Sequence, residues 1–572
     1  MLYHDFLKEK LMDLMCSEFV DHNFDEIKSK KSFSIEIPNS IKFGDISTNI
    51  AMVFSKDLGM SSFELAGKIC EKLKNNQNII KLDIVGPGFI NIFFKETFWF
   101  DQLKILINSL ENYSYKIKKK KICIEFVSAN PTGLMHIGHA RGAVLGDTIA
   151  SILEEIGHEV TREYYINDAG EQIKKLLKTL NYYRDKDSDK DIKFSDELYP
   201  GEYLKKLSEK VNKEINSNKS HSNEENLVNL IMLDVKRDLK NIKVEHHSFI
   251  SEKVISSKKN VEILINLLEE KKLSYLGFQK KPMSIDDKNW VKKKQLLFKS
   301  KNFGDDMDRA LLKPNGDLTY FMSDIIYHQN KIDRNFDILI NIWGVDHSGY
   351  VKRLKNCMSE LNKNKKFVFE IKLTSLVNLL EGKKTVKMSK RAGNYVTLRD
   401  VIDKVGVDVL RFMMISRNAD KKIDFDFEIV KSKTKDNPVF YVQYAYARCM
   451  SLFKIYKKIF NSNFSNFDFK KRKISNLNLV EEKLIIKKLC NFFNVIISSA
   501  NNQEPHRITN YLYDLAKDFH AYWGLGKIES SKKIIIEDNF EISQERMLLV
   551  MGISIIIKKG MNLLKINCPE NM

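Results

Sequence analysis

Two short motifs combine basic and small residues in spacings suited to binding phosphate. The first is His136-Ile137-Gly138-His139, where a loop enters a helix expected from His139 to Ile156. Amide groups at a helix N-terminus attract anions, and two imidazoles one turn apart add hydrogen-bond donors. Gly138 permits close approach of the backbone. The alternative is a simple helix cap, and a zinc site is not favoured because no third ligand is evident.

The second motif is Lys387-Met388-Ser389-Lys390, followed by a further arginine and placed before a helix that is expected to start near Leu398. Three cations around a small stretch suit a mobile loop that neutralises a polyphosphate leaving group. A solvated basic loop is the alternative, since lysine is abundant throughout this chain.

The elements around the first motif form a recognisable unit. Ile122–Ser128 alternates apolar and polar residues as a half-buried strand does, the helix follows, and Glu159–Ile166 is rich in β-branched and aromatic residues. Strand, helix and strand indicate a βαβ unit and a parallel sheet. Sheet-like runs return at Leu318–Met322 and Ile338–Trp343 and lead towards polar residues, where ligands of open α/β sheets gather.

The remaining chain divides by composition. Strands are expected near Phe33–Ile37 and Asp83–Phe94, before the lysine-rich connector Lys118–Lys121. Residues from about 178 to 285 are polar and favour an insertion with exposed helices. Beyond about 440 the apolar spacing is helical almost throughout.

Length and charge limit the function further. A chain of 572 residues supports several domains and is too long for a minimal binding module. The net charge of +19 favours a polyanionic partner, although 79 lysines against 15 arginines could also reflect biased gene composition. Seven scattered cysteines indicate neither a disulfide framework nor a zinc ribbon. With no signal peptide and no apolar run of membrane-spanning length, we expect a cytoplasmic protein without a membrane partner.

Together and in this order, the two motifs resemble the paired signatures of class I aminoacyl-tRNA synthetases. Longer segments resemble the bacterial-type arginyl-tRNA synthetase family: EFVSANPTG at 125–133, YYINDAGEQI at 164–173, FGDDMDRALL at 303–312, LTYFMSDIIYH at 318–328, WGVDHSGYV at 343–351 and NPVFYVQYAYAR at 437–448. FGDISTN at 43–49 and VGPGFIN at 85–91 resemble that family's additional first domain. Only the range 178–285 matches poorly.

The resemblance implies a ligase that activates arginine with ATP to arginyl-adenylate, releases pyrophosphate, and transfers arginine to the 3′-terminal adenosine of tRNA(Arg). It implies catalytic roles for His136, His139, Lys387 and Lys390. ATP contacts are expected from Ala129, Asn130, Pro131, Thr132, Gly133, Leu134, Met135, His136, Ile137, Gly138, His139, Asp346, His347, Met388 and Ser389. Mg²⁺ is expected to arrive with ATP, and no bound structural metal is expected.

The implied arginine pocket consists of Glu125, Tyr320 and Asp324, with Ser128 and Asn130 holding the α-amino and carboxylate groups. A guanidinium presents five N–H donors in a planar fork that carboxylates match, whereas a lysine substrate would leave buried acceptors underpaired. Tyr320 and Asp324 could instead form an exposed polar edge, and Glu125 could face solvent.

The implied fold is multidomain α/β plus all-α. An N-terminal α+β domain at 1–118 would contact the outer corner of the tRNA around its D-loop, and a Rossmann-type catalytic domain would span 119–385 with the insertion at about 178–285. The lysine-motif loop and a connecting region would occupy 386–438, before a helical anticodon-binding domain at 439–572. There Tyr441, Tyr444, Tyr446 and Arg448 could stack on unpaired bases or could pack in the helical core. A monomer is expected, as is adenylate formation that requires tRNA.

Two alternatives remain at this point. A class I synthetase for glutamate, glutamine, lysine or cysteine would share the phosphate motifs but should lack the acidic pocket and the first domain. A non-enzymatic RNA-binding relative would share the charge and the helices but should have lost one motif, whereas both histidines and both lysines are present.

Overall fold

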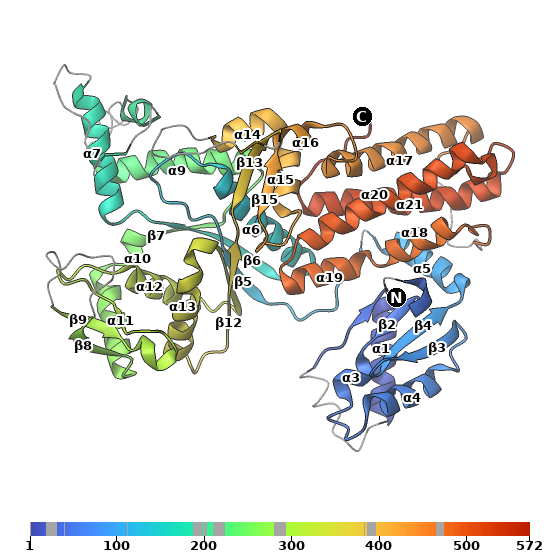
Figure 1. Ribbon diagram of the computed structural model, residues 1–572, viewed down its shortest axis with the longest axis horizontal. Coiled ribbons are helices and arrows are strands. Elements are labelled where there is room, and N and C mark those ends of the chain that lie inside the picture. The colour runs from blue at the N-terminus through green and yellow to red at the C-terminus, as the bar shows by residue number, and fades with distance from the viewer. Residues whose placement is uncertain are drawn as a thin grey trace.

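A five-stranded parallel sheet lies at the centre of the molecule (Figure 1). Its strands are β5 (Lys121–Glu125), β6 (Glu159–Ile166), β7 (Ser248–Ser251), β11 (Ile338–Gly344) and β12 (Val368–Thr374). They are ordered β12-β11-β5-β6-β7, and every neighbouring pair is parallel. Renumbered along the chain, this order is 5-4-1-2-3, that of a Rossmann-type sheet. The predicted parallel-sheet fold is confirmed.

The computed structural model describes residues 2–18, 31–38, 40–110, 112–186, 198–199, 203–209, 223–279, 293–382, 384–385, 396–464 and 474–572. The lysine motif at 387–390 lies outside the described residues.

The predicted βαβ unit is present as β5, α6 (Ile137–Glu155) and β6. Most of α6 is buried, because the helix is covered by the sheet on one side and by other helices elsewhere. Gly146 makes the close packing possible: a Cβ atom added there would lie 2.2 Å from Cγ of Phe126. The helix that begins with the histidine motif is thus held against the end of β5.

The range predicted as an insertion, 178–285, contains part of the central sheet itself. Its β7 pairs with β6 and is the edge strand beyond it. The helices α7 (Glu171–Lys186) and α9 (Asn223–Asn241) pack together before β7, and α10 (Glu252–Ile255) and α11 (Lys258–Glu270) follow it. A small antiparallel sheet of β8 (Ser274–Phe278), β9 (Lys294–Phe298) and β10 (Arg309–Ala310) comes next.

The sheet-like run predicted at Leu318–Met322 is wrong. Thr319 caps the helix α12 (Tyr320–Asp333), and its side chain accepts a hydrogen bond from the amide of Met322 at 3.3 Å. Aromatic and threonine residues favour strands by propensity, but here a cap and tertiary packing decide the local structure.

Further elements connect the sheet to the helical region. These are α13 (Ser348–Leu361), β13 (Val377–Glu381), β14 (Lys384–Thr385), α14 (Leu398–Val405), α15 (Val407–Ile415), β15 (Ile423–Asp426) and α16 (Phe427–Lys431). β13 pairs with β14 and with β15 in a separate three-stranded sheet.

The N-terminal region is an α+β unit. The strands β1 (Ile35–Glu36), β2 (Ile46–Thr48), β4 (Phe89–Phe94) and β3 (Ile79–Val85) form an antiparallel sheet in that order, with α1 (Tyr3–Glu18), α3 (Ile50–Phe54), α4 (Ser62–Leu73) and α5 (Glu96–Ser109). Gly88 in the turn between β3 and β4 has φ of +123°, and an added Cβ would lie 2.8 Å from the carbonyl oxygen of Ser62. Glycine is required there.

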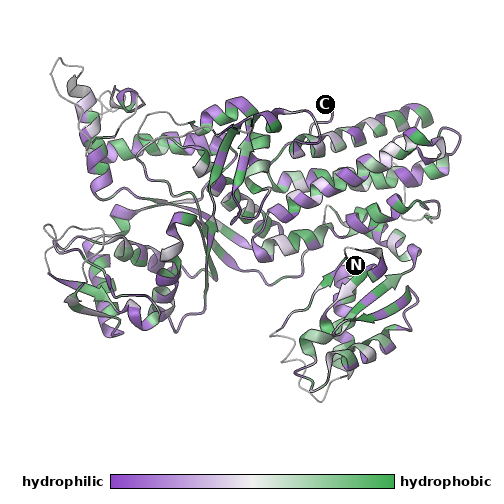
Figure 2. Cartoon of the chain, in the orientation of Figure 1, coloured by the Kyte–Doolittle hydropathy of each residue, from purple (hydrophilic) through white to green (hydrophobic). Residues whose placement is uncertain are grey.

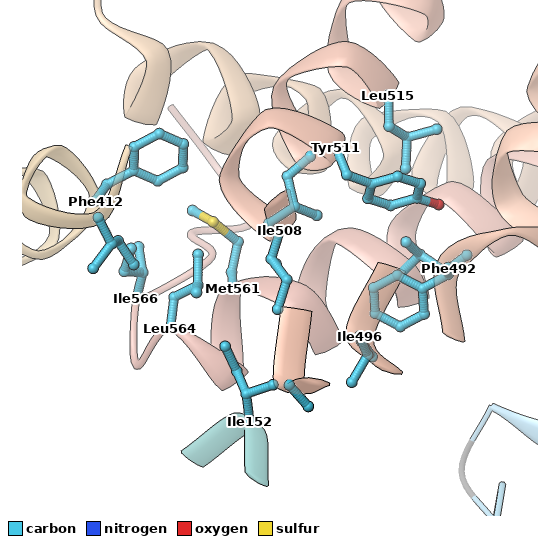
Figure 3. Close-up of a cluster of buried hydrophobic side chains, with 14 of the residues drawn as sticks. Ile152, Phe412, Phe492, Ile496, Ile508, Tyr511, Leu515, Met561, Leu564 and Ile566 are labelled. Atoms are coloured by element: carbon cyan, nitrogen blue, oxygen red, sulfur yellow. The ribbon is translucent and has the colours of Figure 1, made fainter. Parts of the chain in front are cut away.

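The C-terminal region is helical, as predicted, and consists of α17 (Pro438–Phe460), α18 (Val480–Cys490), α19 (Phe492–Asn502), α20 (His506–Ile528) and α21 (Phe540–Leu563). Green and purple alternate along these helices, as expected where one face of each is buried (Figure 2). The core of this region continues onto α6, which packs against the central sheet. Ile152 of α6, Phe412 of α15, Ile508 of α20 and Met561 of α21 meet in one cluster (Figure 3).

Polar contacts also join the three regions. Tyr3 donates a hydrogen bond to Asn491 at 2.9 Å, and the ring of Tyr113 stacks on Phe493. Asp147 of α6 is fully buried and pairs with Arg411 of α15 at 2.8 Å and with Lys565, beyond α21, at 2.7 Å. The last residues of the chain are therefore fixed to the helix that carries the histidine motif.

Among the described residues, no helix combines the length and the apolar character needed to cross a membrane.

Candidate active site

A cleft of about 770 Å³ opens where the carboxyl ends of β5, β6, β7 and β11 meet. Many residues predicted for the site from sequence line it: Glu125, Ser128, Ala129, Asn130, His139, Tyr320, Asp324, Asp346 and His347. They come from segments up to about 200 residues apart, and the sheet brings them together as the rule for parallel α/β folds requires.

The loop after β5 has a strained backbone. Val127 has φ of +71° and Ser128 has φ of +39°, and this region is costly for a β-branched residue. Neighbouring groups hold the loop in place: the amide of Tyr165 donates to Oγ of Ser128 at 3.1 Å, and Oη of Tyr164 donates to the carbonyl of Ala129 at 2.9 Å. These hydrogen bonds hold the loop in its strained conformation.

His136 and His139 stack at the start of α6 with ring centroids 3.8 Å apart. Nδ1 of His136 accepts from the amide of Gly138 at 3.2 Å, while Nδ1 of His139 accepts from the amide of His136 at 3.3 Å. The helix cap is therefore formed by the same two residues that the sequence predicts to bind phosphate. With each Nδ1 accepting, each ring carries its proton on Nε2, the tautomer that can donate to a ligand.

The segment after the lysine motif docks on the histidine loop. Thr397 forms a β-bridge with His136, and the amide of Leu398 donates to the carbonyl of Met135 at 2.9 Å. Thr397 and Asp400 form a capping box that starts α14, so the predicted helix near Leu398 is confirmed. Thr397, which follows the second motif in sequence, therefore lies beside the first motif.

Three of the carboxylates that line the cleft, Glu125, Glu252 and Asp324, lie close together and differ in their partners. Glu125 is 5% exposed; its Oε1 accepts from Oγ of Ser128 at 3.0 Å and its Oε2 from Nζ of Lys331 at 2.7 Å. Among the described residues, neither Asp324 nor Glu252 has a cation within ion-pair distance. Burial and the charges of Glu125 and Glu252 raise the pKa of Asp324 to about 7.

Glu252 was not predicted from the sequence. Burial and the charge of Asp168 raise its pKa above the usual value. Glu252 is the first residue after β7. In the sequence, its position directly after a short apolar run could have indicated a residue of the site. That signal is hidden by the polar composition of the surrounding range. Two acids without a cation in a cleft make a site for a cationic ligand.

Tyrosines surround these acids. Tyr320 is 69% exposed and stands at the edge of the cleft, whereas the buried hydroxyls of Tyr165 and Tyr350 face the carboxylates of Glu252 and Asp324, respectively. The predicted pocket residues Tyr320 and Asp324 thus lie together, and Glu125 faces inward rather than towards solvent.

The opposite wall comes from the end of β11. Trp343 and Gly344 lead into the turn Val345–His347, where Asp346 and His347 are exposed and 3.5 Å apart. An exposed polar pair beside a flat indole is suited to a ribose or a purine ring.

The rest of the predicted ATP loop turns away from the cleft. Pro131, Met135 and Ile137 are buried, so that only their backbone can reach a ligand. Gly133, Leu134 and Met135 line a separate cavity of about 160 Å³ against α9 and Arg399. Oη of Tyr203 donates to the carbonyl of Thr132 at 2.7 Å.

The aromatic residues predicted to bind tRNA lie on α17. Arg448 lies over the rings of Tyr444 and Trp523, with centroid distances of 4.6 and 3.8 Å, and Tyr441 lies beside His520. Tyr446 is 3% exposed and packs in the core, so the prediction that it stacks on a base is corrected. On this helix a spacing of two residues places Tyr446 on a different face from Tyr444.

No group of three metal-ligating side chains is found among the described residues.

Family models match three consecutive parts of the chain. They are the arginyl-tRNA synthetase N-terminal domain at residues 4–94, the catalytic domain of class I tRNA synthetases of the arginine type at 102–432, and the DALR anticodon-binding domain at 442–572. The catalytic model alone spans more than half of the sequence. The chain belongs to the arginyl-tRNA synthetase family.

Curated arginine–tRNA ligases agree with this arginyl-tRNA synthetase assignment. The protein of Pelagibacter ubique is 40% identical over 99% of both chains, and that of Wolbachia pipientis from Culex pipiens is 41% identical over 95% of both. Among solved structures, an arginyl-tRNA synthetase from Campylobacter jejuni matches with a TM-score of 0.71 and 26% identity, covering 84% of this chain and all of that one. The Thermus thermophilus arginyl-tRNA synthetase matches over the full length of both with a TM-score of 0.71 at 18% identity, which shows the shared fold.

Proposed function

We propose that the cleft activates arginine with ATP and then transfers the arginyl group to the 3′-terminal adenosine of tRNA(Arg). The overall activity, arginine–tRNA ligase, follows from membership of the family. The proposal concerns which residues of this chain perform it.

The observation that carries the assignment of the arginine site is a pair of acids next to the histidine loop, Asp324 and Glu252, which have no cation within ion-pair distance among the described residues. A guanidinium placed between them would supply the missing positive charge and its N–H groups would be paired by carboxylate oxygens. The arginine carboxylate would then point towards His139 and Asn130, where the α-phosphate of ATP is expected.

In the first step a carboxylate oxygen of arginine attacks the α-phosphorus, and the bond from that phosphorus to the oxygen bridging to the β-phosphate breaks. Donors from His136 and His139 would stabilise the charge on the phosphates. Lys387 and Lys390 remain predicted partners of the departing pyrophosphate. The bridge between His136 and Thr397, which follows the lysine motif in sequence, supports this prediction. In the second step a ribose hydroxyl attacks the arginyl carbonyl carbon and AMP leaves.

Several predictions from the sequence stay predictions. They are Mg²⁺ carried by ATP, activity as a monomer in the cytoplasm, contact of the N-terminal region with the tRNA outer corner, and the domain boundaries at about 118, 385 and 438. The partly exposed rings of Tyr444 and Trp523 beside Arg448 support anticodon reading by the helical region, because planar rings beside a cation suit unpaired bases.

The test is aminoacylation of total tRNA with each of the twenty amino acids in turn. Arginine alone should be attached, and ATP–pyrophosphate exchange should require arginine. Charging with glutamate, glutamine, lysine or cysteine in place of arginine would contradict the proposal.

A further inference from the structure

Lys331 is a buried lysine beneath the acidic pocket. It lies on α12, two turns beyond Asp324, and is 1% exposed. Its Nζ donates to Oε2 of Glu125 at 2.7 Å and to Oδ1 of Asn341 at 3.1 Å, and it lies 4.1 Å from the ring centroid of Tyr327. Burying an ammonium group costs free energy unless the group is paired and hydrogen-bonded, and these contacts of Lys331 offset that cost.

The first consequence concerns Glu125. Lys331 takes one oxygen of this carboxylate and Ser128 takes the other. The negative charge of Glu125 is thereby balanced within the protein. Asp324 and Glu252 remain as the carboxylates that an arginine side chain can neutralise.

The second consequence is a chain of hydrogen bonds towards Asp324. Because Oδ1 of Asn341 accepts from Lys331, Nδ2 of Asn341 is the donor to Nε2 of His328 at 2.7 Å. Nδ1 of His328 therefore carries the proton and donates to the backbone carbonyl of Asp324 at 2.7 Å. Burial and the charge of Lys331 hold the pKa of His328 well below its usual value, which keeps the ring neutral as this chain requires.

We propose, building on the proposed arginine site, that Lys331 is a positioning residue for substrate selection: it neutralises Glu125 and, through Asn341 and His328, fixes the turn of α12 that presents Asp324 to the guanidinium. Lys331 itself does not touch the substrate. Arginine would be selected at Asp324 and Glu252, with Glu125 acting as the anchor of the strained loop at Ser128.

The groups around Asp324 determine how replacing Lys331 should change the protonation of the pocket. Glu125 faces it from β5, Tyr165 from β6, Glu252 from α10 and Tyr350 from α13, with His328 and Lys331 on its own helix. Without the lysine, three carboxylates would share the pocket uncompensated. The carboxylates of the pocket would then hold a proton more tightly. This proton must leave when arginine binds, so binding would require a higher pH.

The experiment measures arginine binding to the full-length enzyme by calorimetry between pH 6 and pH 8.5, with KM for ATP taken from pyrophosphate exchange in the presence of tRNA. For Lys331→Met we expect the Kd for arginine at pH 7.5 to rise about tenfold or more, KM for ATP to change less than about twofold, and the pH midpoint of arginine binding to rise by about one unit. Lys365→Met is the matched control, because Lys365 pairs with Asp333 of the same helix at an exposed position.

The double variant Glu125→Gln with Lys331→Met removes both members of the ion pair and should return the pH midpoint close to that of the wild type. If neither Lys331 variant folds, Asn341→Ala tests the hydrogen-bond chain alone and should weaken arginine binding without moving the midpoint. Equal losses for arginine and ATP, or a midpoint that stays fixed in Lys331→Met, would overturn the positioning role, as would unchanged arginine affinity in Asn341→Ala. A wild type that binds no arginine would instead refute the proposed function.

Discussion

Asp324 combines a buried carboxyl group with two acidic neighbours, and this combination makes arginine binding sensitive to pH. Its pKa is raised to about 7 by burial and by the charges of Glu125 and Glu252. Below that pH the empty site holds a proton that must leave before a guanidinium can bind.

We therefore expect the Kd for arginine to fall by up to about tenfold per unit as the pH rises towards 7, and to level off above about pH 8. Calorimetry in buffers of different ionisation enthalpy would also detect the released proton. In Asp324→Asn the affinity should be low and nearly independent of pH over this range. A wild-type Kd that is constant from pH 6 to 8 would show that Asp324 is already ionised in the empty site.

Glu252 is the second acid of the pocket and gives a separate prediction. Glu252→Gln should raise the KM for arginine by about ten- to a hundredfold, because a buried charge partner of the guanidinium is lost. The KM for ATP should stay within about twofold. Glu225→Gln is the control, since Glu225 pairs at the surface with Lys253, the residue next to Glu252. A similar increase in the KM for arginine in both variants would show that Glu252 does not belong to the arginine pocket.

Among the elements, α6 connects the reaction to the rest of the fold. Its first residues form the histidine motif, its middle packs on β5, and Asp147 binds Arg411, Lys565 and Arg162 together. A carboxylate shared by three cations is well compensated even when buried. These ion pairs fix the middle of the helix, so that the two histidines at its start keep a defined position.

The contact between α6 and β5 can be tested with two glycines of the same helix. Gly146→Ala should lower the free energy of unfolding by about 1–3 kcal/mol, because the added Cβ meets the ring of Phe126. Gly142→Ala places its Cβ in open space and should be neutral or stabilising by about 0.5–1 kcal/mol. Urea unfolding monitored by circular dichroism compares the two. Equal stability of the variants would contradict the tight packing.

At the scale of the whole molecule, the cleft and the aromatic group of α17 lie in different regions. The C-terminal segment and the shared core of Figure 3 join those regions. The net charge of +19 suits such a long tRNA-binding surface, because phosphate contacts supply much of nucleic-acid affinity. Because the two sites lie in different regions, we expect that a substitution can impair tRNA binding without impairing arginine binding, and the reverse.

Arg448→Ala should lower kcat/KM for tRNA by about ten- to a hundredfold, since it removes the cation that lies over Tyr444 and Trp523. The Kd for arginine should not change. Tyr446→Phe alters a residue of the same helix that is buried, and it should leave tRNA charging as in the wild type. Loss of arginine binding in Arg448→Ala would indicate a folding defect instead of a lost tRNA contact.

Features that depend on a few consecutive residues could be predicted from the sequence. The βαβ unit around His136 and His139, the helix after Thr397 and the helical C-terminal region follow from periodicity and caps, and all are present. Local patterns failed where propensity and packing disagree, as at Leu318–Met322, and where exposure decides, as at Tyr446.

Which charged side chains of the site pair with one another depends on the tertiary structure. Lys331 and Glu125 are 206 residues apart in sequence, and their pairing is set by the order of β11, β5 and β6 in the sheet. The same order brings Glu252, hidden in a polar stretch of sequence, next to Asp324. Charges interact through space and not along the chain, so motifs could indicate which residues meet ATP but not which carboxylate is left for arginine.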